Sequence, residues 1–409
     1  MCNNSLKAYL IYFYSLVFPV SAAFSNIILG LLIICSLLER NLKEKFKVIK
    51  NNKLVLIIYA IPLLLFISTI LSSTASHGFF MNSGINNEYE FIIKHFIWLN
   101  FLFLILMTSK FDIQKVIKMF LIGIFFSETI SYLVFFHIID INYFKKIGLL
   151  YRHIAYNNPS PFMHHSFYSI YLAVSIILIF DNLSKLKGIF KIISMTFLFS
   201  ATMNLFLNGG RIGQIAFFIG VILYVYKKYK NVKLFIFTII VLSFVFMLAY
   251  KISPIFKTRA NMAYNGITKV VLHKNYGSSW GRRIAADIAV LKIMLNNPKY
   301  ILFGFGAGNA KKVFFEKGEK NASSEINFIK NFSHVHNQYF QLWIDGSILA
   351  FLLIFLFFYF LYRYNPSALT LSFIGIISFS FIADVIWYRP QTYILILFMS
   401  AILYKQGNK

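Results

Sequence analysis

The chain has 409 residues, of which 58% are hydrophobic and only 13% are charged, and its mean hydropathy is +0.68. Charged residues make up about a quarter of a typical soluble domain, so this composition excludes a soluble protein and indicates an integral membrane protein. The formal net charge of +26 would suggest a nucleic-acid partner in a soluble chain. Here we expect no nucleic acid, because basic loops fix cytoplasmic orientation and meet anionic lipid.

Recurring apolar runs of about 20 residues predict an all-α membrane helix bundle, since that length crosses the hydrocarbon layer. The first apolar stretch, residues 8–38, is too long for one span, and Pro19 divides it into two short helices. With this pair we predict about twelve transmembrane helices and a cytoplasmic location for both chain ends. The other spans are predicted near 54–73, 91–109, 119–137, 167–180, 192–208, 212–226, 234–250, 339–362, 367–386 and 391–404.

Polar outward loops separate some of these spans, near residues 74–90 and 138–166, and a much longer one follows Tyr250. Residues 251–338 contain no run long enough to span, and the count of crossings places them outside the cytoplasm. We therefore predict one polytopic domain, residues 1–409, with a large periplasmic loop, residues 251–338, that carries part of the functional site.

One amphipathic helix is predicted inside this long loop, after an N-cap at Ser278-Ser279 and before a stop at Asn296-Asn297-Pro298. Its apolar stripe is expected to lie on the membrane surface; the stripe consists of Ile284, Ile288, Leu291 and Leu295. Arg282 and Arg283 fall in the first turn, where the helix dipole disfavours cations. They either contact lipid headgroups or bind a phosphorylated substrate, which suits the planar guanidinium group.

Two glycine-containing turns are further candidates for contact with an anion. Gly304, Gly306 and Gly308 form a turn whose backbone N–H groups could approach a phosphate, although a plain surface turn has the same pattern. Two predicted spans are connected only by Asn208-Gly209-Gly210. This short turn places Arg211 at the boundary of the membrane on its outward side. This arginine is either a membrane anchor or a ligand for an anion.

A histidine pair, His334 and His336, stands where the long loop meets the next apolar run, and Asn337 follows it. Two histidines in this spacing could ligate a metal, but the outward loops offer no obvious third and fourth ligand. One neutral imidazole could instead act as a general base, with Asn337 orienting a ring or a sugar. A pair of polar boundary residues without chemistry is the third possibility. Within apolar runs, Glu128 and Asp384 must face the bundle or water, and Arg389 is a candidate partner for Asp384.

Three stretches together resemble the O-antigen ligase and polymerase superfamily of bacterial membrane proteins. They are Asn208-Gly-Gly-Arg211-Ile-Gly, the loop segment from Arg283-Ile-Ala-Ala-Asp287 through Pro298 to Gly304-Phe-Gly306-Ala-Gly308-Asn309, and His334-Val-His336-Asn337-Gln-Tyr-Phe-Gln341 followed by Gly346. Their order, with a large outward loop between two late spans, is more specific than any one motif. The chain departs from the family in having Asp287 where a tryptophan is common, and in the early position of Gly346.

The resemblance implies a GT-C-like bundle in the bacterial inner membrane that transfers a glycan from undecaprenyl pyrophosphate to lipid A–core on the periplasmic face. It implies an inverting reaction without metal or cofactor, in which Arg211 and Arg283 hold the donor pyrophosphate and His336 removes the proton of the acceptor hydroxyl. We expect the other candidates to contact substrate: His334, Asn337, Arg282, Gly304, Gly306 and Gly308.

The superfamily leaves two reactions open, and a third possibility lies outside it. A ligase attaches a finished glycan to lipid A–core, whereas a polymerase extends the lipid-linked glycan, and the sequence does not separate the two. A flippase or exporter of lipid-linked sugars would need polar groups through the midplane of the membrane, but the candidate residues gather at the outer boundary.

Overall fold

The structure is a computed structural model that describes residues 4–39, 42–71, 92–329, 332 and 334–408. Over these residues the chain is helical and contains no strand, only a single bridge between Ala155 and Asn158. This confirms the predicted all-α class. The predicted polar loop near 74–90 lies outside the described residues.

The helices before the long loop follow the predicted spans closely, with shifts of a few residues at their ends. They are α1 (Asn4–Val17), α2 (Ala22–Leu37), α3 (Leu42–Lys50), α4 (Lys53–Leu71), the π-helix η2 (Ile92–Ile97), α6 (Trp98–Thr108), α7 (Ile113–Phe135), α8 (Ile141–Lys146), α9 (His165–Leu183), α10 (Gly188–Leu207), α11 (Arg211–Tyr229) and α12 (Val232–Ile252). The predicted break at Pro19 is confirmed, because α1 ends at Val17 and the Ser21 hydroxyl caps the first turn of α2.

The remaining helices form the long loop and the C-terminal part of the bundle. They are α13 (Pro254–His273), α14 (Ser279–Leu295), α15 (Pro298–Phe303), α16 (Ala310–Glu316), α17 (Gly318–Asn321), α18 (Ser323–Ile329), α19 (Gln338–Gly346), α20 (Ile348–Tyr364), α21 (Ala368–Ala383), the 3₁₀-helix η3 (Ile386–Tyr388) and α22 (Pro390–Gly407). The predicted span 339–362 is wrong as a single helix. It divides into α19 and α20 because Ser347 adopts φ 109°, which no α-helix accommodates.

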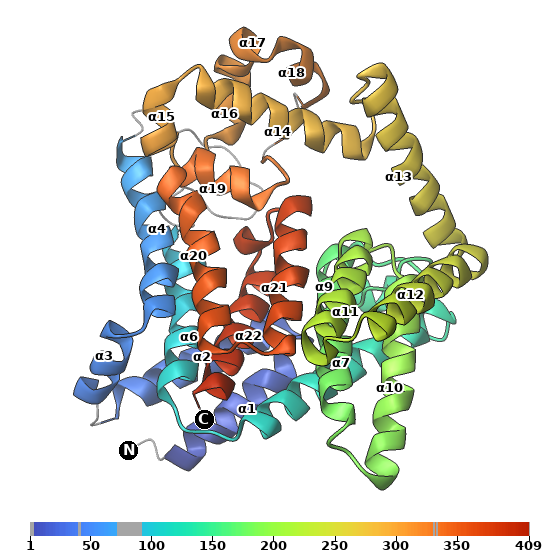
Figure 1. Ribbon diagram of the computed structural model, residues 1–409. Coiled ribbons are helices and arrows are strands. Elements are labelled where there is room, and N and C mark those ends of the chain that lie inside the picture. Colours follow the sequence, from blue (N-terminus) through green and yellow to red (C-terminus); the bar gives the residue numbers. More distant parts are fainter. Residues whose placement is uncertain (1–3, 40–41, 72–91, 330–331, 333, 409) are drawn as a thin grey trace.

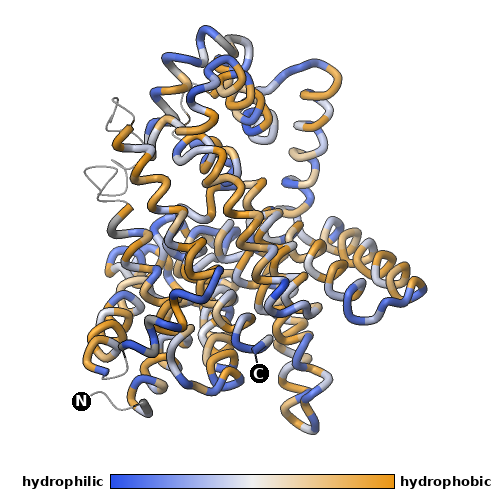
Figure 2. Tube along the Cα trace, turned by 60° about the vertical axis from the view of Figure 1, so that its left-hand side comes forward, coloured by the Kyte–Doolittle hydropathy of each residue, from blue (hydrophilic) through white to orange (hydrophobic). Residues whose placement is uncertain are grey.

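Six of the described helices are long and apolar enough to cross a membrane: α4, α7, α9, α10, α11 and α12. Shorter apolar helices of 10–17 residues include α2, α20 and α21. The chain is therefore a membrane protein with at least several candidate spans, and the number twelve stays a prediction. Figure 2 shows hydrophobic residues along the helices and hydrophilic residues mainly at their ends and turns.

The bundle is packed around its C-terminal helix. Every residue of α22 from Thr392 to Leu403 is buried, as expected for a helix that is apolar all round. α21 packs against α11 and α9, and the Ser372 hydroxyl donates to the Gly220 carbonyl at 2.7 Å. This packing brings the first residues of α9 and α11 close to the last residues of α21.

The helices α14–α18 have a small hydrophobic core of their own, and we call this unit the cap. The cap lies over α19 and the tops of α4 and α20, while α13 connects it to α12 (Figure 1). Val335 precedes α19 and Ile344 lies within it, and both side chains are buried in the cap core. The histidine segment is therefore held by the cap on one side and by the bundle on the other.

The predicted amphipathic helix is confirmed as α14, capped by the Ser278 hydroxyl, which accepts from Gly281 N at 2.9 Å. The predicted apolar stripe faces away from the cap core, with Leu291 and Leu295 exposed and Ile284 and Ile288 partly exposed, and its contact with the membrane surface stays a prediction. A different face of α14 is buried in the cap, and it includes Ala285, Ala289 and Ile293. The alanines of this face let α14 pack closely on α18.

Candidate active site

The histidine pair meets a carboxylate contributed by a distant part of the chain. His336 Nδ1 lies 3.3 Å from Asp384 Oδ1, and His334 Nε2 lies 3.7 Å from the same oxygen. The two imidazoles are stacked obliquely, with ring centroids 4.0 Å apart. Asp384 follows the last residue of α21, so the packing of α21 on the bundle positions the carboxylate.

His336 is held in an unusual backbone conformation. Its φ of 60° is in the left-handed region, which only a few per cent of non-glycine residues adopt and in which histidine is enriched. The Phe332 ring packs edge-on against the imidazole at 4.8 Å between centroids. Because Nδ1 faces Asp384, Nε2 points to the opposite side of the ring, and a quarter of the side chain remains exposed. The arrangement leaves one ring nitrogen available to a substrate.

Burial and charge give the two neighbours of His336 different protonation states. Burial opposes ionisation of Asp384, but the contacts from His334 and His336 outweigh it and hold the pKa of this carboxyl well below its usual value. Burial lowers the pKa of His334 to about 4, although Asp384 acts in the opposite direction. At neutral pH the cluster therefore contains a carboxylate and a neutral His334, so the negative charge is available to His336.

Three arginines lie together on the other side of the site. The Arg211 guanidinium, at the first residue of α11, is within electrostatic reach of both Arg259 on α13 and Arg283 on α14. Among the described residues, no carboxylate forms an ion pair within 4.0 Å of any of the three. Clustered guanidinium groups without acidic partners are suited to binding a polyanion such as a diphosphate.

His164 and His165 at the start of α9 connect the arginines to the histidine–carboxylate cluster. Their rings stack at 3.9 Å between centroids. His164 interacts electrostatically with Asp384, and His165 interacts with Arg211 and Arg259. The two groups of candidate residues thus face one site, although more than a hundred residues separate α9 from His336 in the chain.

Glycine at the start of α11 is required by its contact with α9. A Cβ atom at Gly210 would lie 2.5 Å from the His165 carbonyl oxygen, and one at Gly213 would lie 2.2 Å from backbone atoms of Ser169. The Gly213 N–H donates to the Ser169 hydroxyl at 3.1 Å. These glycines thus allow a close backbone contact between α11 and α9, and this contact brings Arg211 beside His165.

Asn337 joins the cap to the histidine segment. Its Nδ2 donates to Asp287 Oδ2 on α14 at 3.2 Å, and its Oδ1 accepts from Tyr339 N at 3.1 Å, which caps α19. Burial raises the pKa of Asp287 to about 7, although Asn337 and Arg283 both act to lower it. The predicted role of Asn337 toward a sugar stays a prediction, since these atoms are engaged in the protein.

The glycine turn is also engaged in packing. Phe305 N donates to Ile344 O at 2.6 Å, and Gly306 N and Ala307 N donate to the hydroxyls of Ser68 and Thr69 on α4. Gly304, Gly306 and Gly308 all have positive φ, and a Cβ at Gly304 would lie 2.8 Å from Ile344 O. The glycine turn therefore connects the cap to the bundle. Substrate binding by these glycines stays a prediction.

Comparison with known proteins matches the part of the chain that carries this site. The sequence model of the O-antigen ligase family matches residues 194–355. By this match, these residues belong to the O-antigen ligase and polymerase superfamily. An uncharacterized protein of Haemophilus influenzae is 28% identical over 197 residues, a match that covers 46% of this chain and 48% of the relative. The match thus spans about half the length of this curated relative.

The superfamily segment contains Arg211, Arg283 and His336 but not all of the site. Asp384 lies beyond residue 355, and His164 and His165 lie before residue 194. The sequence pointed to Arg389 as the partner of Asp384, whereas the structure places this carboxylate against both imidazoles. Arg259 was not singled out from the sequence, and Arg282 is exposed next to the partly buried Arg283.

The Asp384 carboxylate is a candidate for the third metal ligand, which the sequence did not reveal. One donor atom each from His334, His336 and Asp384 lies within 4.8 Å of the others, a spacing that a metal ion would accept. Arg389, however, interacts electrostatically with both His334 and His164, and the arginine cluster lies beyond His165. This positive surrounding disfavours a divalent cation and favours an anionic substrate.

Proposed function

We propose that this member of the O-antigen ligase superfamily is a ligase that transfers a glycan from undecaprenyl pyrophosphate to lipid A–core at the periplasmic face of the bacterial inner membrane. The observation that carries the proposal is the pairing of His336 with Asp384 opposite arginines that, in the described part of the chain, form no ion pair within 4.0 Å. A base and a diphosphate site in one place are the two requirements of glycosyl transfer from a lipid-linked donor.

In the proposed reaction, His336 Nε2 accepts the proton of an acceptor hydroxyl as the oxygen attacks the anomeric carbon of the donor sugar. The new glycosidic bond forms while the bond to the diphosphate oxygen breaks, and undecaprenyl pyrophosphate leaves with the bonding electrons. Attack opposite the leaving group inverts the anomeric centre. Asp384 stabilises the imidazolium formed at His336, as a carboxylate does for a histidine base.

The arginines have the role of binding the diphosphate through the reaction. Arg211 and Arg283 approach it from α11 and α14, so they can neutralise the charge that develops on the leaving oxygen. Two guanidinium groups make a metal unnecessary for this step. Transfer by the purified enzyme in EDTA would support this mechanism, whereas loss of activity that Mg²⁺ or Zn²⁺ restores would assign His334, His336 and Asp384 to a metal.

A polymerase is the second candidate, because the superfamily match supports either reaction. The same base and arginines would then act on an acceptor that is itself lipid-linked. The two reactions differ only in the acceptor and can be separated by their products in cells.

The test is the surface lipopolysaccharide of a deletion strain complemented with wild type, His336→Ala or the control His273→Ala. His273 is an exposed histidine at the end of α13, so its substitution should restore the wild-type profile. For a ligase, deletion and His336→Ala should abolish every glycan-bearing form while polymer accumulates on the carrier lipid. Core bearing one repeat without a ladder would identify a polymerase, and a normal profile in the deletion strain would refute both.

A further inference from the structure

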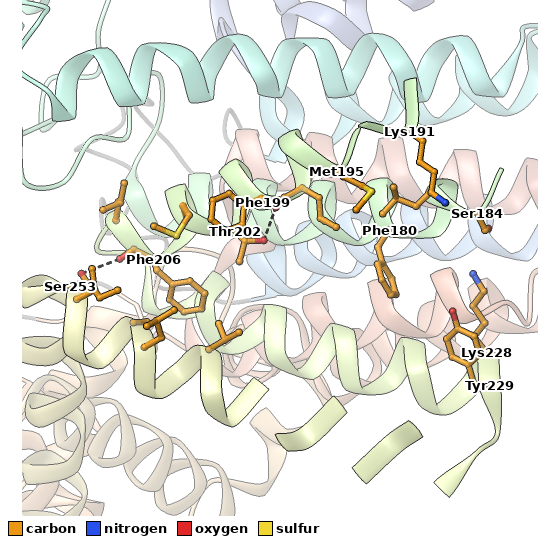
Figure 3. Close-up of a pocket in the computed structure, with 18 residues that line it drawn as sticks. Phe180, Ser184, Lys191, Met195, Phe199, Thr202, Phe206, Lys228, Tyr229 and Ser253 are labelled. Carbon is orange, nitrogen blue, oxygen red and sulfur yellow. Dashed lines mark hydrogen bonds between the residues drawn. The ribbon is translucent and has the colours of Figure 1, made fainter. Parts of the chain in front are cut away.

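An apolar groove lies on the lipid-facing side of the bundle, between α10 and α12 (Figure 3). Its volume is about 850 Å³, and most of its lining side chains are apolar. Phe199 and Met203 on α10 and Leu248 and Ala249 on α12 contribute to its walls. Most large side chains of both helices are exposed in the bundle, so a lipid can enter the groove sideways from the bilayer.

The length of the groove indicates what kind of lipid fits. It is lined along α10 from Lys191 to Leu207, which corresponds to roughly 24 Å at 1.5 Å per helical residue. An acyl chain of one leaflet reaches through about half of a hydrocarbon core that is about 30 Å thick. A single phospholipid therefore fills only part of the groove, whereas a long isoprenoid chain can follow all of it.

One end of the groove leads to the arginine cluster. Leu207 lines this end and is separated from Arg211 only by the Asn208-Gly209-Gly210 turn. On the opposite wall, Ser253 also lines the groove, and its hydroxyl donates to the Phe206 carbonyl at 3.3 Å. Ser253 caps α13, the helix that carries Arg259. Both walls of the groove thus continue directly into elements that hold arginines.

We propose that this groove binds the isoprenoid tail of the lipid-linked donor, with the diphosphate at the Arg211 end. The inference rests on the proposed function for the identity of the donor. Because the tail is already in lipid, the groove gains little from the hydrophobic effect and acts through packing. Its consequence is orientation, since a tail fixed along α10 places the diphosphate beside the arginines.

Photo-crosslinking tests the binding site without requiring catalysis. The full-length protein, in vesicles of phosphatidylethanolamine and phosphatidylglycerol, carries benzoylphenylalanine at Phe199, and the probe is radiolabelled undecaprenyl pyrophosphate without a glycan. Phe190, on the same helix, is the matched control, because its exposed fraction is 68% against 70% for Phe199 but it does not line the groove. We expect labelling at 199 that unlabelled undecaprenyl pyrophosphate displaces, and little labelling at 190.

Filling the groove tests its effect on the donor. Ala249→Trp places an indole inside the groove, and Val241→Trp places one on the same helix at a residue that does not line the groove. We expect Ala249→Trp to raise the KM for the undecaprenyl-linked donor on the order of fivefold, with no change for a donor analogue that has a short isoprenoid tail. Val241→Trp should leave both values unchanged.

The outcomes separate this inference from the proposed function. If position 199 is labelled specifically and transfer activity survives His336→Ala, the groove still binds the isoprenoid tail and the role of His336 as the base is refuted. Equal labelling at 199 and 190, or equal KM changes for long and short tails, would overturn the groove. Labelling at 199 by a photoreactive phosphatidylglycerol but not by the isoprenoid probe would also overturn the isoprenoid assignment. The groove would then bind an anionic phospholipid, whose headgroup would meet Lys191 and Lys228 at the other end of the groove.

Discussion

Replacement of Asp384 by asparagine is the sharpest test of the proposed base. Asparagine keeps the volume of the side chain and an oxygen that can face His336 Nδ1, but it removes the negative charge. The variant should fold, since Asp384 lies in the connection between α21 and η3 and not inside a helix. The change therefore isolates the electrostatic contribution of the carboxylate to the reaction.

The distance sets the size of the effect. Opposite unit charges separated by the 3.3 Å between His336 Nδ1 and Asp384 Oδ1 attract by about 5 kcal/mol at an effective dielectric constant of about 20. The imidazole is one-quarter exposed, and screening by solvent reduces this attraction, by roughly half, to about 2.5 kcal/mol. Loss of that stabilisation in the transition state lowers kcat by about 70-fold.

The assay is transfer by the purified protein in lipid vesicles, with kcat and KM measured against acceptor and donor separately. Asp345→Asn is the control, because Asp345 is a buried carboxyl group in α19 whose Oδ2 accepts from Gln341 Nε2 at 2.7 Å and which interacts with Tyr388 and Gly308 rather than His336. We expect the loss in Asp384→Asn to appear in kcat with KM nearly unchanged. A kcat within about threefold of wild type, a loss under 1 kcal/mol, would refute the proposed role of Asp384.

Three further predictions concern the cap side of the site and the second histidine. Arg283→Lys should lower kcat/KM for the donor by roughly tenfold or more, because a single ammonium replaces a bidentate guanidinium group; an unchanged donor KM and kcat would remove the diphosphate role. Asp287 binds its proton up to about pH 7 in the folded protein, against about 3.8 when unperturbed, so its contribution to stability is present at low pH and is lost as pH rises through about 7. Thermal unfolding of Asp287→Asn should therefore lack this part of the pH dependence, and an unaltered profile would contradict the assignment. His334→Ala should reduce kcat less than His336→Ala does, as measured in the same transfer assay; an equal loss would reopen the metal interpretation.

The sequence predicted the helices well because their boundaries depend on local chemistry. Pro19 separates α1 from α2. Ser278 caps the start of α14, and Pro298 begins α15 just after α14 ends. These signals act within a few residues, so a single sequence contains them. The break between α19 and α20 was missed because it follows from the positive φ of Ser347, and serine carries no strong signal for that conformation.

Tertiary partners were harder to predict than helices. The sequence predicted only the outward apolar stripe of α14, because the face that is buried depends on packing against α18, a partner that no local pattern identifies. Asp384 meets His336 only because α21 ends beside the start of α19, and no local pattern connects residues 48 positions apart. Arg211 and Arg283 were found because charge at a membrane boundary or in the first turn of a helix is unusual in itself.

The division between cap and bundle has a consequence for the order of events in a reaction cycle. The segment around His336 is buried in the cap core through Val335, whereas Asp384 and Arg211 are positioned by bundle helices. The proposed base meets its carboxylate only when the two cores are docked, and the Asn337–Asp287 hydrogen bond holds the histidine segment to the cap. Separation of the cores would leave a bound donor beside an arginine but without an active base. The donor would then stay unreacted until docking is complete, because no base would be in place to activate an acceptor hydroxyl or a water molecule.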